Sequence, residues 1–415
     1  MSVLLVNPFG LKQGWAFDIP TNLLYLYSAL RNAGVEVDLA DGNMIGLDGV
    51  KAKILEMKPD IVGISCISPV RFTALDIAQF AKERVGAKVV IGNHHAHWMH
   101  EQILNTYPFV DACALGEGEE TIVSLAQSDD WKTVKGLATR CYGKPSYNLR
   151  GRLENLDDIA FPAWDAVDLK VYKASNALGP RVYYSRGCFA GCKFCNSPKF
   201  WKGYRFRSVN NFCDEIEWLH ELGMEWSSIG DDLGTYDKSV DLFTEMLNRK
   251  GRIAVPFNVT TRSDCVTDDL CRLMAEVGVQ SVAVGVESGS QRMLDSMCKG
   301  ITVEQSRQAM LSIRKYGMAS TALIITGAIG ETPADREATN ALMREVRPTE
   351  IGTVGSLWLF PDTKWWDEIR AGKYDSLIHS GKELVDYSFY LDPRWAQHVL
   401  SWNNGNIIPV RVTEC

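Results

Sequence analysis

The first 140 residues alternate short apolar runs with amphipathic segments. The runs that predict strands read SVLLVNP, VEVDLAD, DIVGISC, KVVIGN and VDACALG, and Thr21 to Ala33 has the apolar spacing of a helix that ends at Gly34. Strands that alternate with helices predict a doubly wound parallel sheet. Ligands of such sheets bind beyond the carboxyl ends of the strands, which here carry NPFG, ADGN, SCISPV, GNHHAH and GEGEE.

This alternation stops between residues 141 and 177, where RLENLDDIAFPAWDAVDL has neither a helical nor a strand period and predicts a linker. A second alternating series occupies residues 178–370, with strand-like runs in RVYYSRG, SSIGDD, PFNVTTR, SVAVGVESG, STALIITGAIGE and IGTVGSLWLFP. Six such runs separated by helices predict a partial (β/α)6 barrel of the TIM type. Residues 371–415 form a short C-terminal region that is rich in Tyr and Trp and less regular.

Composition narrows the class of protein. The chain has 415 residues, of which 46% are hydrophobic and 23% charged, as in globular proteins of two or three domains. A net charge of −7 argues against a general nucleic-acid binder, since phosphate recognition requires a basic surface. We find no apolar run of about 18 residues that predicts a membrane span, and MSVLLVNPFG lacks the basic start of a signal peptide. The 11 scattered cysteines favour a reduced, cytoplasmic protein.

Three cysteines stand apart from the others in RGCFAGCKFCN. Cys188, Cys192 and Cys195 have the spacing C-x3-C-x2-C directly after the strand-like run RVYYS. Thiolates at such spacing bind zinc or an iron–sulfur cluster. A zinc site commonly has a fourth protein ligand from a second close pair, and the sequence offers no such pair. A 4Fe–4S cluster held by three thiolates keeps one iron open for another ligand, so this alternative is favoured over zinc.

The triplet, with Phe194 before its last cysteine, resembles the radical S-adenosylmethionine (SAM) enzymes, in which the open iron binds SAM and the reduced cluster cleaves it to a 5′-deoxyadenosyl radical. Later segments resemble the same family in the same order: GDD at the second strand end, TTRSD at the third, GVESG at the fourth and GAIGE after the next. The resemblance implies that SAM is bound by Phe194, Asp231, Asp232, Arg262, Glu287, Ser288 and Gly327. A guanidinium suits the SAM carboxylate because it binds carboxylates through two hydrogen bonds.

Structural alternatives remain for several of these side chains. Asp232 and Glu287 could bond helix N-termini, and Arg262 could form a surface ion pair of little energetic value. Lys299 also matches a position of the family, although a solvated lysine at a helix end is an equal alternative. Tyr204, Arg205 and Arg207, which follow the cysteine loop, could close over the site or be exposed.

The N-terminal pattern resembles the Rossmann-like cobalamin-binding domain that is fused to many radical SAM enzymes. It lacks D-x-H-x-x-G, the motif that supplies a histidine to cobalt, as fused members commonly do. Where the family usually has Gly-Gly-Pro-His-Ala, this chain has Gly92-Asn93-His94-His95-Ala96, and an Asn side chain there could crowd the cofactor's tail. The resemblance implies cobalamin binding by residues at the carboxyl ends of the strands, namely Ser65, Ser68, Gly92, Asn93, His95, Gly116 and Glu117. A histidine pair such as His97 and His100 could alternatively ligate a metal.

The resemblance implies three cofactors: a 4Fe–4S cluster, SAM and cobalamin. The reaction implied is reductive cleavage of SAM, hydrogen abstraction from a small natural-product-type substrate and methyl transfer from methylcobalamin. The alternative is a cobalamin-independent dehydratase, epimerase or rearrangement enzyme that keeps only the fold of the cobalamin domain. An external reductant such as flavodoxin or ferredoxin would supply the electron. The sequence does not identify the substrate or a residue that assists the substrate radical.

Overall fold

The structure is a computed structural model. It describes residues 1–8, 17–175, 177, 179–224, 227–249, 256–354, 360–371, 373, 399–403 and 406–410. The chain divides into two compact units. The first comprises Met1–Ser185, Phe200–Asn211 and Glu221–Met224, and the second comprises Arg186–Lys199, Phe212–His220 and Glu225–Cys415. Among the described residues, no helix is long and apolar enough to cross a membrane.

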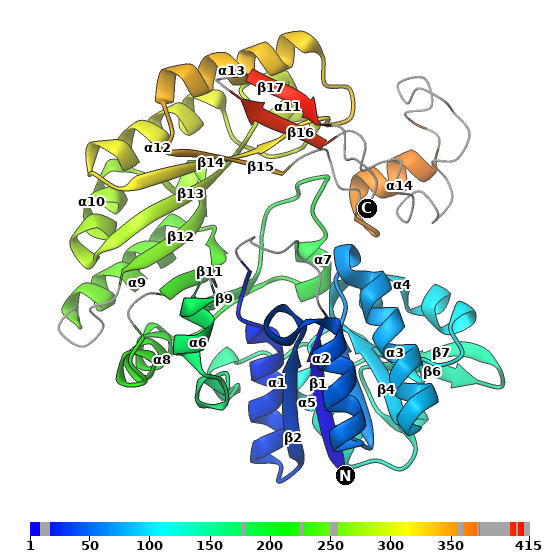
Figure 1. The fold of residues 1–415 in the computed structure, drawn as a ribbon. Coiled ribbons are helices and arrows are strands. Elements are labelled where there is room, and N and C mark those ends of the chain that lie inside the picture. Colours follow the sequence, from blue (N-terminus) through cyan, green and yellow to red (C-terminus); the bar gives the residue numbers. More distant parts are fainter. Residues whose placement is uncertain are drawn as a thin grey trace. The chain divides into compact units, whose positions relative to one another are not determined.

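The first unit is built on a seven-stranded sheet with the order β2-β1-β3-β4-β5-β6-β7 (Figure 1). The strands are β1 (Ser2–Asn7), β2 (Glu36–Asp41), β3 (Ile61–Ser65), β4 (Lys88–Gly92), β5 (Ala112–Ala114), β6 (Leu137–Cys141) and β7 (Lys144–Asn148). Pairing is parallel from β2 to β5, whereas β6 and β7 add antiparallel strands. The hairpin of β6 and β7 extends the sheet to Asn148, and the domain limits 1–140 and 141–177 stay predictions.

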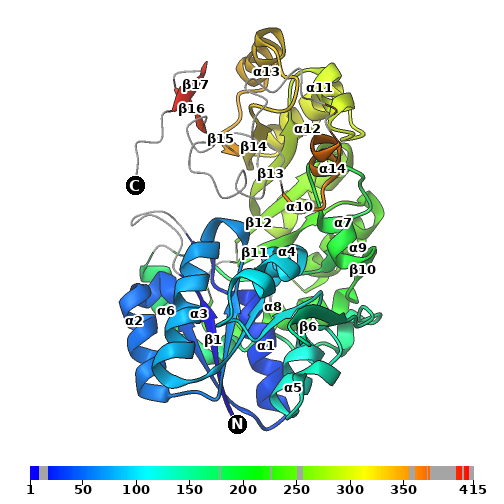
Figure 2. The ribbon, with the colours of Figure 1, turned by 90° about the vertical axis from the view of Figure 1, so that its right-hand side faces the viewer.

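Helices cover both faces of this sheet. Helices α1 (Thr21–Asn32) and α5 (Glu119–Ala126) pack together on one face, and α2 (Gly42–Met57) and α3 (Arg71–Val85) pack together on the other (Figure 2). The core between the sheet and α1 and α5 is apolar, with Leu5, Leu23 and Ile122 among its members. Helix α4 (Asn93–Thr106) begins directly after β4, so all but the first residue of the strand-end segment GNHHAH lies in the first turns of a helix.

The predicted linker, residues 141–177, is part of the first unit and forms hydrogen bonds with its other elements. Short helical turns at Leu156–Asp158 and Trp164–Ala166 precede α6 (Leu169–Ala174). Ser28 of α1 donates a hydrogen bond to the carbonyl of Phe161 (2.6 Å), and the Tyr172 hydroxyl donates to the buried carboxylate of Asp41 (2.7 Å). The run RVYYSRG then forms two short strands, β8 (Arg181–Val182) and β9 (Ser185–Gly187), followed by α7 (Ser197–Trp201), β10 (Tyr204–Phe206) and α8 (Val209–Glu221).

The second unit contains five neighbouring parallel strands in the order β15-β14-β13-β12-β11. They are β11 (Ser227–Leu233), β12 (Phe257–Arg262), β13 (Val279–Glu287), β14 (Ala319–Ile325) and β15 (Glu350–Val354). Figures 1 and 2 show α10 (Asp268–Val277), α12 (Val303–Lys315) and α13 (Pro333–Val346) along one face of these strands. The remaining elements are α9 (Tyr236–Asn248), α11 (Gln291–Ser296), α14 (Lys364–Arg370) and the hairpin of β16 (Val399–Asn403) and β17 (Asn406–Val410).

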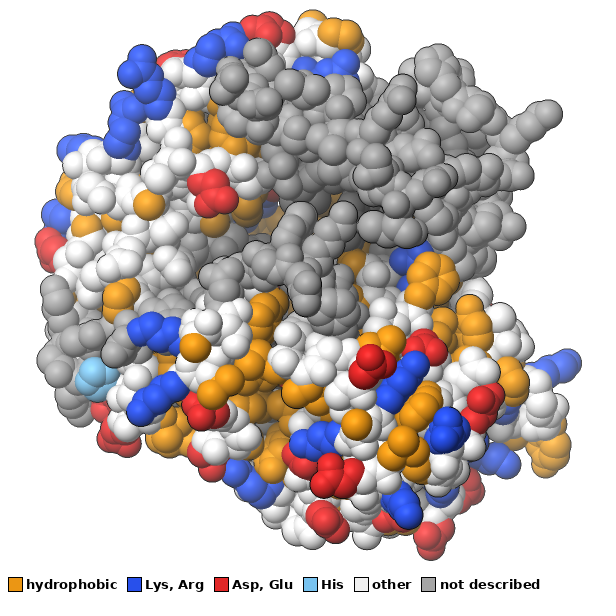
Figure 3. Space-filling view, in the orientation of Figure 1, with side chains coloured by type: hydrophobic (Ala, Val, Ile, Leu, Met, Phe, Trp, Pro, Cys, Tyr) orange, Lys and Arg blue, Asp and Glu red, His pale blue; other side chains and the backbone are white. Residues whose placement is uncertain are grey.

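Most of the C-terminal region that was predicted to be aromatic and irregular lies outside the described residues, including Tyr374, Tyr387, Phe389, Tyr390 and Trp395. The space-filling view shows acidic and basic side chains interspersed over the described surface of the first unit (Figure 3). Mixed signs of this kind are typical of a solvated face and differ from the basic stripe that tracks a nucleic-acid backbone.

Candidate functional site

The cysteine loop is held in place by two distant segments of the second unit. The backbone amide of Lys193 donates to the carbonyl of Met297 (2.9 Å), and its carbonyl accepts from the amide of Trp365 (3.0 Å). The Lys193 ammonium pairs with Glu368 at 3.1 Å, with both side chains largely buried. The Asn196 amide group donates to the carbonyl of Pro361 (3.2 Å). These bonds link the loop to the turn after α11 and to α14, so the three thiols are carried on a constrained backbone.

The donor set suits a cluster. Cys188, Cys192 and Cys195 are partly buried and not in disulfides, and backbone amides point at two of the sulfurs: Ala190 N to Cys188 Sγ and Ser197 N to Cys195 Sγ, each at 3.4 Å. The described residues contain no group of three ligands already gathered around a single ion. In a 4Fe–4S cluster, however, each thiolate binds a different iron. The three cysteines of such a site therefore do not have to meet around a single ion.

The net pKa of Cys192 is raised, although two cations near it act in the opposite direction. Burial is the largest cause of the rise in this pKa, and the opposing cations are Lys299 and Arg262. Cys265, buried beside Asp264, has its pKa raised to about 12, chiefly by burial, and so resembles a packed thiol. The protein therefore places cations near one member of the cysteine triplet.

Arg262 ends β12 and is buried, with 6% of its surface exposed. Its Nε and Nη2 donate to the two carboxylate oxygens of Asp264 (2.9 and 3.0 Å), and Nη2 also donates to the carbonyl of Lys299 (3.0 Å). The ring of Phe189, on the cysteine loop, lies 5.4 Å from the guanidinium carbon. Arg262 is thus a fixed, buried cation beside the loop, and the alternative of a surface ion pair is wrong.

Glu287 and Lys299 form a buried ion pair at the end of β13. The Lys299 ammonium donates to Glu287 Oε1 at 2.7 Å, and each residue is 7% exposed. Burial alone would lower the pKa of Lys299, but the carboxylate of Glu287 outweighs it and the net direction is upward. The alternative of a solvated Lys299 is therefore wrong. Sequence reasoning noted both residues but not their pairing.

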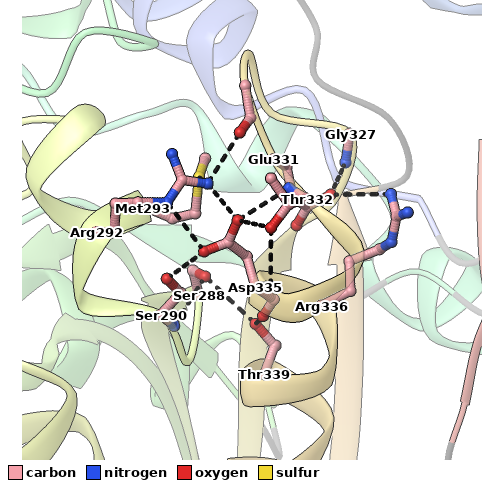
Figure 4. A network of polar contacts seen from close by, with 11 residues as sticks. Ser288, Ser290, Arg292, Met293, Gly327, Glu331, Thr332, Asp335, Arg336 and Thr339 are labelled. Carbon is pink, nitrogen blue, oxygen red and sulfur yellow. Dashed lines mark hydrogen bonds and ion pairs between the residues drawn. The ribbon is translucent and has the colours of Figure 1, made fainter.

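Ser288 belongs to a polar network that joins the loop after β13 to α13 (Figure 4). Asp335 is its centre, accepting from Ser290 Oγ (2.6 Å), from Thr332 N (2.9 Å) and from Arg292. Burial alone would raise the pKa of Asp335, but these hydrogen bonds outweigh it and hold the pKa well below its usual range. Gly289 lies so close to α13 that a Cβ there would be 2.6 Å from the carbonyl of Ala338. The network fixes the loop that presents Ser288.

The neighbouring loop after β14 carries Gly327, whose φ of 68° lies in the left-handed region. Its amide donates to Glu331 Oε2 at 2.9 Å, which closes the loop on itself (Figure 4). Phe194 packs against the cluster of Met293, Met297, Ile325, Ala328 and Trp365. Asp231 and Asp232 lie on β11, and their side chains are outside the described part of the structure.

The predicted cobalamin residues of the first unit lie at the carboxyl ends of β3, β4 and β5, where their polar side chains bond one another. Ser65 Oγ accepts from Asn22 and from Asn93, both at 3.0 Å, and Ser68 Oγ lies 2.9 Å from His95 Nδ1. The side chain of Asn93 is therefore turned back against β3. Its φ of 78° lies in the left-handed region, which Asn tolerates better than most non-glycine residues.

Apolar surface remains at this edge. Ile67 is 43% exposed and Phe72 is 54% exposed, and a Cβ built on Gly116 would meet nothing within 4 Å. An exposed apolar floor with open glycine backbone is suited to covering by a large flat ring, so the residues present fit a corrin. The carboxylate of Glu117, whose role in cobalamin binding stays a prediction, accepts hydrogen bonds from Arg205 (3.0 Å) and from the amide of Leu153 (2.9 Å).

Three histidines on α4 are buried or half-buried, which favours their neutral forms. Burial lowers the pKa of His94, His95 and His97 to about 4 in each case. The ring of His94 stacks on Phe200 with centroids 3.9 Å apart, and His97 Nδ1 accepts from the amide of Gly116 (3.0 Å). His100 Nδ1 lies 2.8 Å from the carbonyl of His97. These rings are thus used in packing and hydrogen bonds, and the described residues offer no group that gathers His97 and His100 around a metal.

Comparisons with known proteins agree with this architecture. Residues 19–126 match the B12 binding domain and residues 182–343 match the Radical SAM superfamily. An uncharacterized methyltransferase of Pyrococcus horikoshii is 28% identical over 358 residues, which are 84% of this chain and 78% of that protein. The anaerobic magnesium-protoporphyrin IX monomethyl ester cyclase of Rubrivivax gelatinosus is 30% identical over 354 residues, which are 79% of this chain and 62% of that protein.

The fold is also that of a solved enzyme. The radical SAM methyltransferase TsrM from Kitasatospora setae, solved with tryptophan and a SAM analogue, superposes with a TM-score of 0.76 at 21% identity, covering 89% of this chain and 76% of TsrM. A second structure of TsrM contains cobalamin and a [4Fe–4S] cluster. The chain belongs to the radical SAM superfamily, with a B12-binding domain before the radical SAM domain as predicted. It is a radical SAM enzyme whose cofactors are a 4Fe–4S cluster, SAM and cobalamin.

Proposed function

We propose that this chain is a cobalamin-dependent methyltransferase that transfers a methyl group to a carbon atom of a small molecule. The observation that carries the proposal is two ion pairs, Arg262 with Asp264 and Glu287 with Lys299, beside the loop of three cysteines. A zwitterionic amino acid group such as that of SAM needs a cation and an anion a short distance apart. A structural scaffold would not need three charged side chains buried here, namely Arg262, Glu287 and Lys299, because burying charge is costly.

Each residue has a defined task in the proposal. Cys188, Cys192 and Cys195 would hold the cluster, which supplies an electron to SAM when bound. Arg262, whose Nε and Nη2 edge is taken by Asp264, would meet the SAM carboxylate through Nη1, and Glu287 would accept from the SAM amino group. Ser288, Gly327 and Phe194 would line the ribose and adenine, with Asp231 and Asp232 at the neighbouring strand end.

The first unit would hold cobalamin at the carboxyl ends of β3, β4 and β5. Cobalamin, when bound, carries the methyl group between SAM and the substrate. Ile67 and Phe72 would support the apolar ring, and the backbone of Gly92 and Gly116 would allow close approach. Ser65, Ser68, Asn93, His95 and Glu117 would shape this edge through the bonds they make with one another and with neighbouring residues. A flavodoxin or ferredoxin in the cytoplasm would be a suitable electron source.

A second candidate is a radical reaction without methyl transfer. The relative from Rubrivivax gelatinosus is named as a cyclase, and it is as similar to this chain as the relative named as a methyltransferase. The two candidates predict different products from SAM. A methyltransferase that recharges cobalamin forms S-adenosylhomocysteine, whereas a cyclase or rearrangement enzyme forms 5′-deoxyadenosine alone.

The test is product analysis of the reconstituted holoenzyme under anaerobic conditions with SAM, a reductant and a panel of small molecules. We expect mass spectrometry to detect both S-adenosylhomocysteine and 5′-deoxyadenosine. It should also detect a product that is heavier than its substrate by one methylene unit. With SAM deuterated in its methyl group, the product should carry the label. Deoxyadenosine without S-adenosylhomocysteine for every substrate that reacts would instead support the second candidate.

A further inference from the structure

One short segment of the second unit touches the cysteine loop and both candidate SAM-binding side chains. The carbonyl of Met297 accepts from the amide of Lys193, between Cys192 and Cys195. Two residues later, the carbonyl of Lys299 accepts from Nη2 of Arg262 (3.0 Å), and the ammonium of Lys299 donates to Glu287 (2.7 Å). Residues 297–299 therefore connect three parts of the site that come from separate strands and loops.

The backbone at Glu287 needs such support. Its φ of 61° is in the left-handed region, which is strained for a non-glycine residue and persists only where the surroundings hold it. The register between β13 and β14 shifts between Gly285 and Glu287, so the strand no longer holds this position in a regular ladder. The ion pair with Lys299 is the interaction that fastens the Glu287 side chain.

The chain also leaves room for this pair. A Cβ at Gly285 would lie 2.8 Å from the Lys299 ammonium and 2.9 Å from Glu287 Oε1, so any side chain at this position would displace the pair. Lys299 is only 7% exposed, and its charge acts on both Cys192 and Arg262. A buried lysine so placed is a costly feature unless the site uses its charge.

We propose that Lys299 is a positioning residue that holds Arg262 and Glu287 for SAM and places a compensating positive charge beside the cluster. Its carbonyl orients the guanidinium, and its ammonium orients the carboxylate and balances its charge. This inference rests on the proposed SAM site and deepens it. Because a cluster's reduction potential depends on the net charge around it, Lys299 acts on the cluster as well as on SAM.

The test compares Lys299→Met, Lys299→Arg and a control, Lys315→Met, in the full chain with reconstituted cluster. Lys315 is an exposed lysine of the same unit that pairs with Asp268. We expect Lys299→Met to keep the iron content of the natural protein but to raise the Kd for SAM by about 10- to 100-fold, as loss of an outer-shell partner does. Lys299→Arg should recover part of the affinity, and Lys315→Met should bind SAM normally.

A double-mutant cycle of the cluster's midpoint potential, measured without SAM, distinguishes this role from a merely structural one. Lys299→Met leaves the carboxylate of Glu287 uncompensated and should make the cluster's midpoint potential more negative. Glu287→Gln leaves the ammonium and should make it more positive, and the double variant should return close to the natural value. A lower unfolding temperature with unchanged Kd and unchanged potential would overturn the inference. If the natural protein binds SAM but transfers no methyl group, the proposed reaction fails while the inference stands.

Discussion

At the scale of single residues, the site depends on groups whose charge is buried and therefore strong. Arg262, Glu287 and Lys299 are each at most 7% exposed, and each has a partner within 3.0 Å. Exposed ion pairs of the same types contribute little to stability or binding, because water screens them. Burial makes these pairs costly to break, so substitutions here should affect function with a defined direction.

The ligand assignment predicts that Cys188→Ala, Cys192→Ala and Cys195→Ala each abolish cluster assembly, because a cubane that loses one of three thiolates is no longer held. The measurement is iron and sulfide content with visible absorbance after anaerobic reconstitution. Cys141→Ala is the matched control, since Cys141 is half-buried like the three cysteines of the loop and lies in the first unit. Retention of the iron–sulfur absorbance in any one of the three variants would contradict the assignment of that cysteine.

Arg262→Lys tests the carboxylate contact. The lysine keeps the charge but cannot form the forked pair with Asp264 and still reach a second acceptor. We expect the Kd for SAM to rise about 10- to 100-fold, the loss that corresponds to one hydrogen bond to a charged group, with iron content unchanged. Equal affinity of the variant and the natural protein, measured by equilibrium dialysis, would remove Arg262 from the site.

At the scale of elements, most of the alternating pattern was predictable. The helix expected from Thr21 to Ala33 is α1 (Thr21–Asn32), and the run KVVIGN is β4 (Lys88–Gly92). The start of α4 was missed because Gly92-Asn93 resembles a turn and His94 to His97 lacks a clear apolar period. Its helical form depends on tertiary contacts, such as the stacking of His94 on Phe200.

Helix α4 gives a prediction on pH. His94, His95 and His97 have pKa values lowered to about 4, so the unfolded chain binds protons that the folded chain excludes. Above the ordinary histidine pKa of about 6.5 these side chains are neutral in both the folded and the unfolded chain, so they do not affect stability. As the pH falls from there toward 4, the unfolded chain takes up protons first, and the free energy of unfolding decreases. Each such histidine should cost on the order of 2 kcal/mol at about pH 5.

The measurement is the unfolding temperature of cluster-free protein between about pH 7.5 and 5, for the natural chain and for His97→Asn. Asn can still accept from the amide of Gly116 but does not titrate, so the variant should lose less stability on acidification. His220→Gln, at an exposed position, is the control and should keep the natural pH dependence. An identical pH dependence in His97→Asn and the natural chain would contradict the lowered pKa of His97.

At the scale of the whole molecule, two α/β units each contain parallel strands, and we place one proposed ligand site at the carboxyl ends of the strands of each unit. Because the proposal assigns SAM to the second unit and cobalamin to the first, it predicts what removal of cobalamin alone should do. Protein reconstituted with the cluster but without cobalamin should bind SAM with the natural affinity and form no methylated product. Added cobalamin should restore methylation with a stoichiometry of one per chain. Methylation in cobalamin-free protein would contradict the role proposed for the first unit.

The order of elements and the place of the cysteine loop after a strand were readable from the sequence, because hydrophobic spacing along the chain encodes local geometry; the SAM-binding residues rest on the family resemblance and stay a prediction. The sequence could not show that Lys299 pairs with Glu287, that Asp335 joins two loops or that Glu117 bonds Arg205. These contacts join residues between 12 and 88 positions apart, and only folding brings them together. Only the tertiary structure buries Lys299 and Arg262 near the three cysteines, where their charges are less screened by water than on the surface.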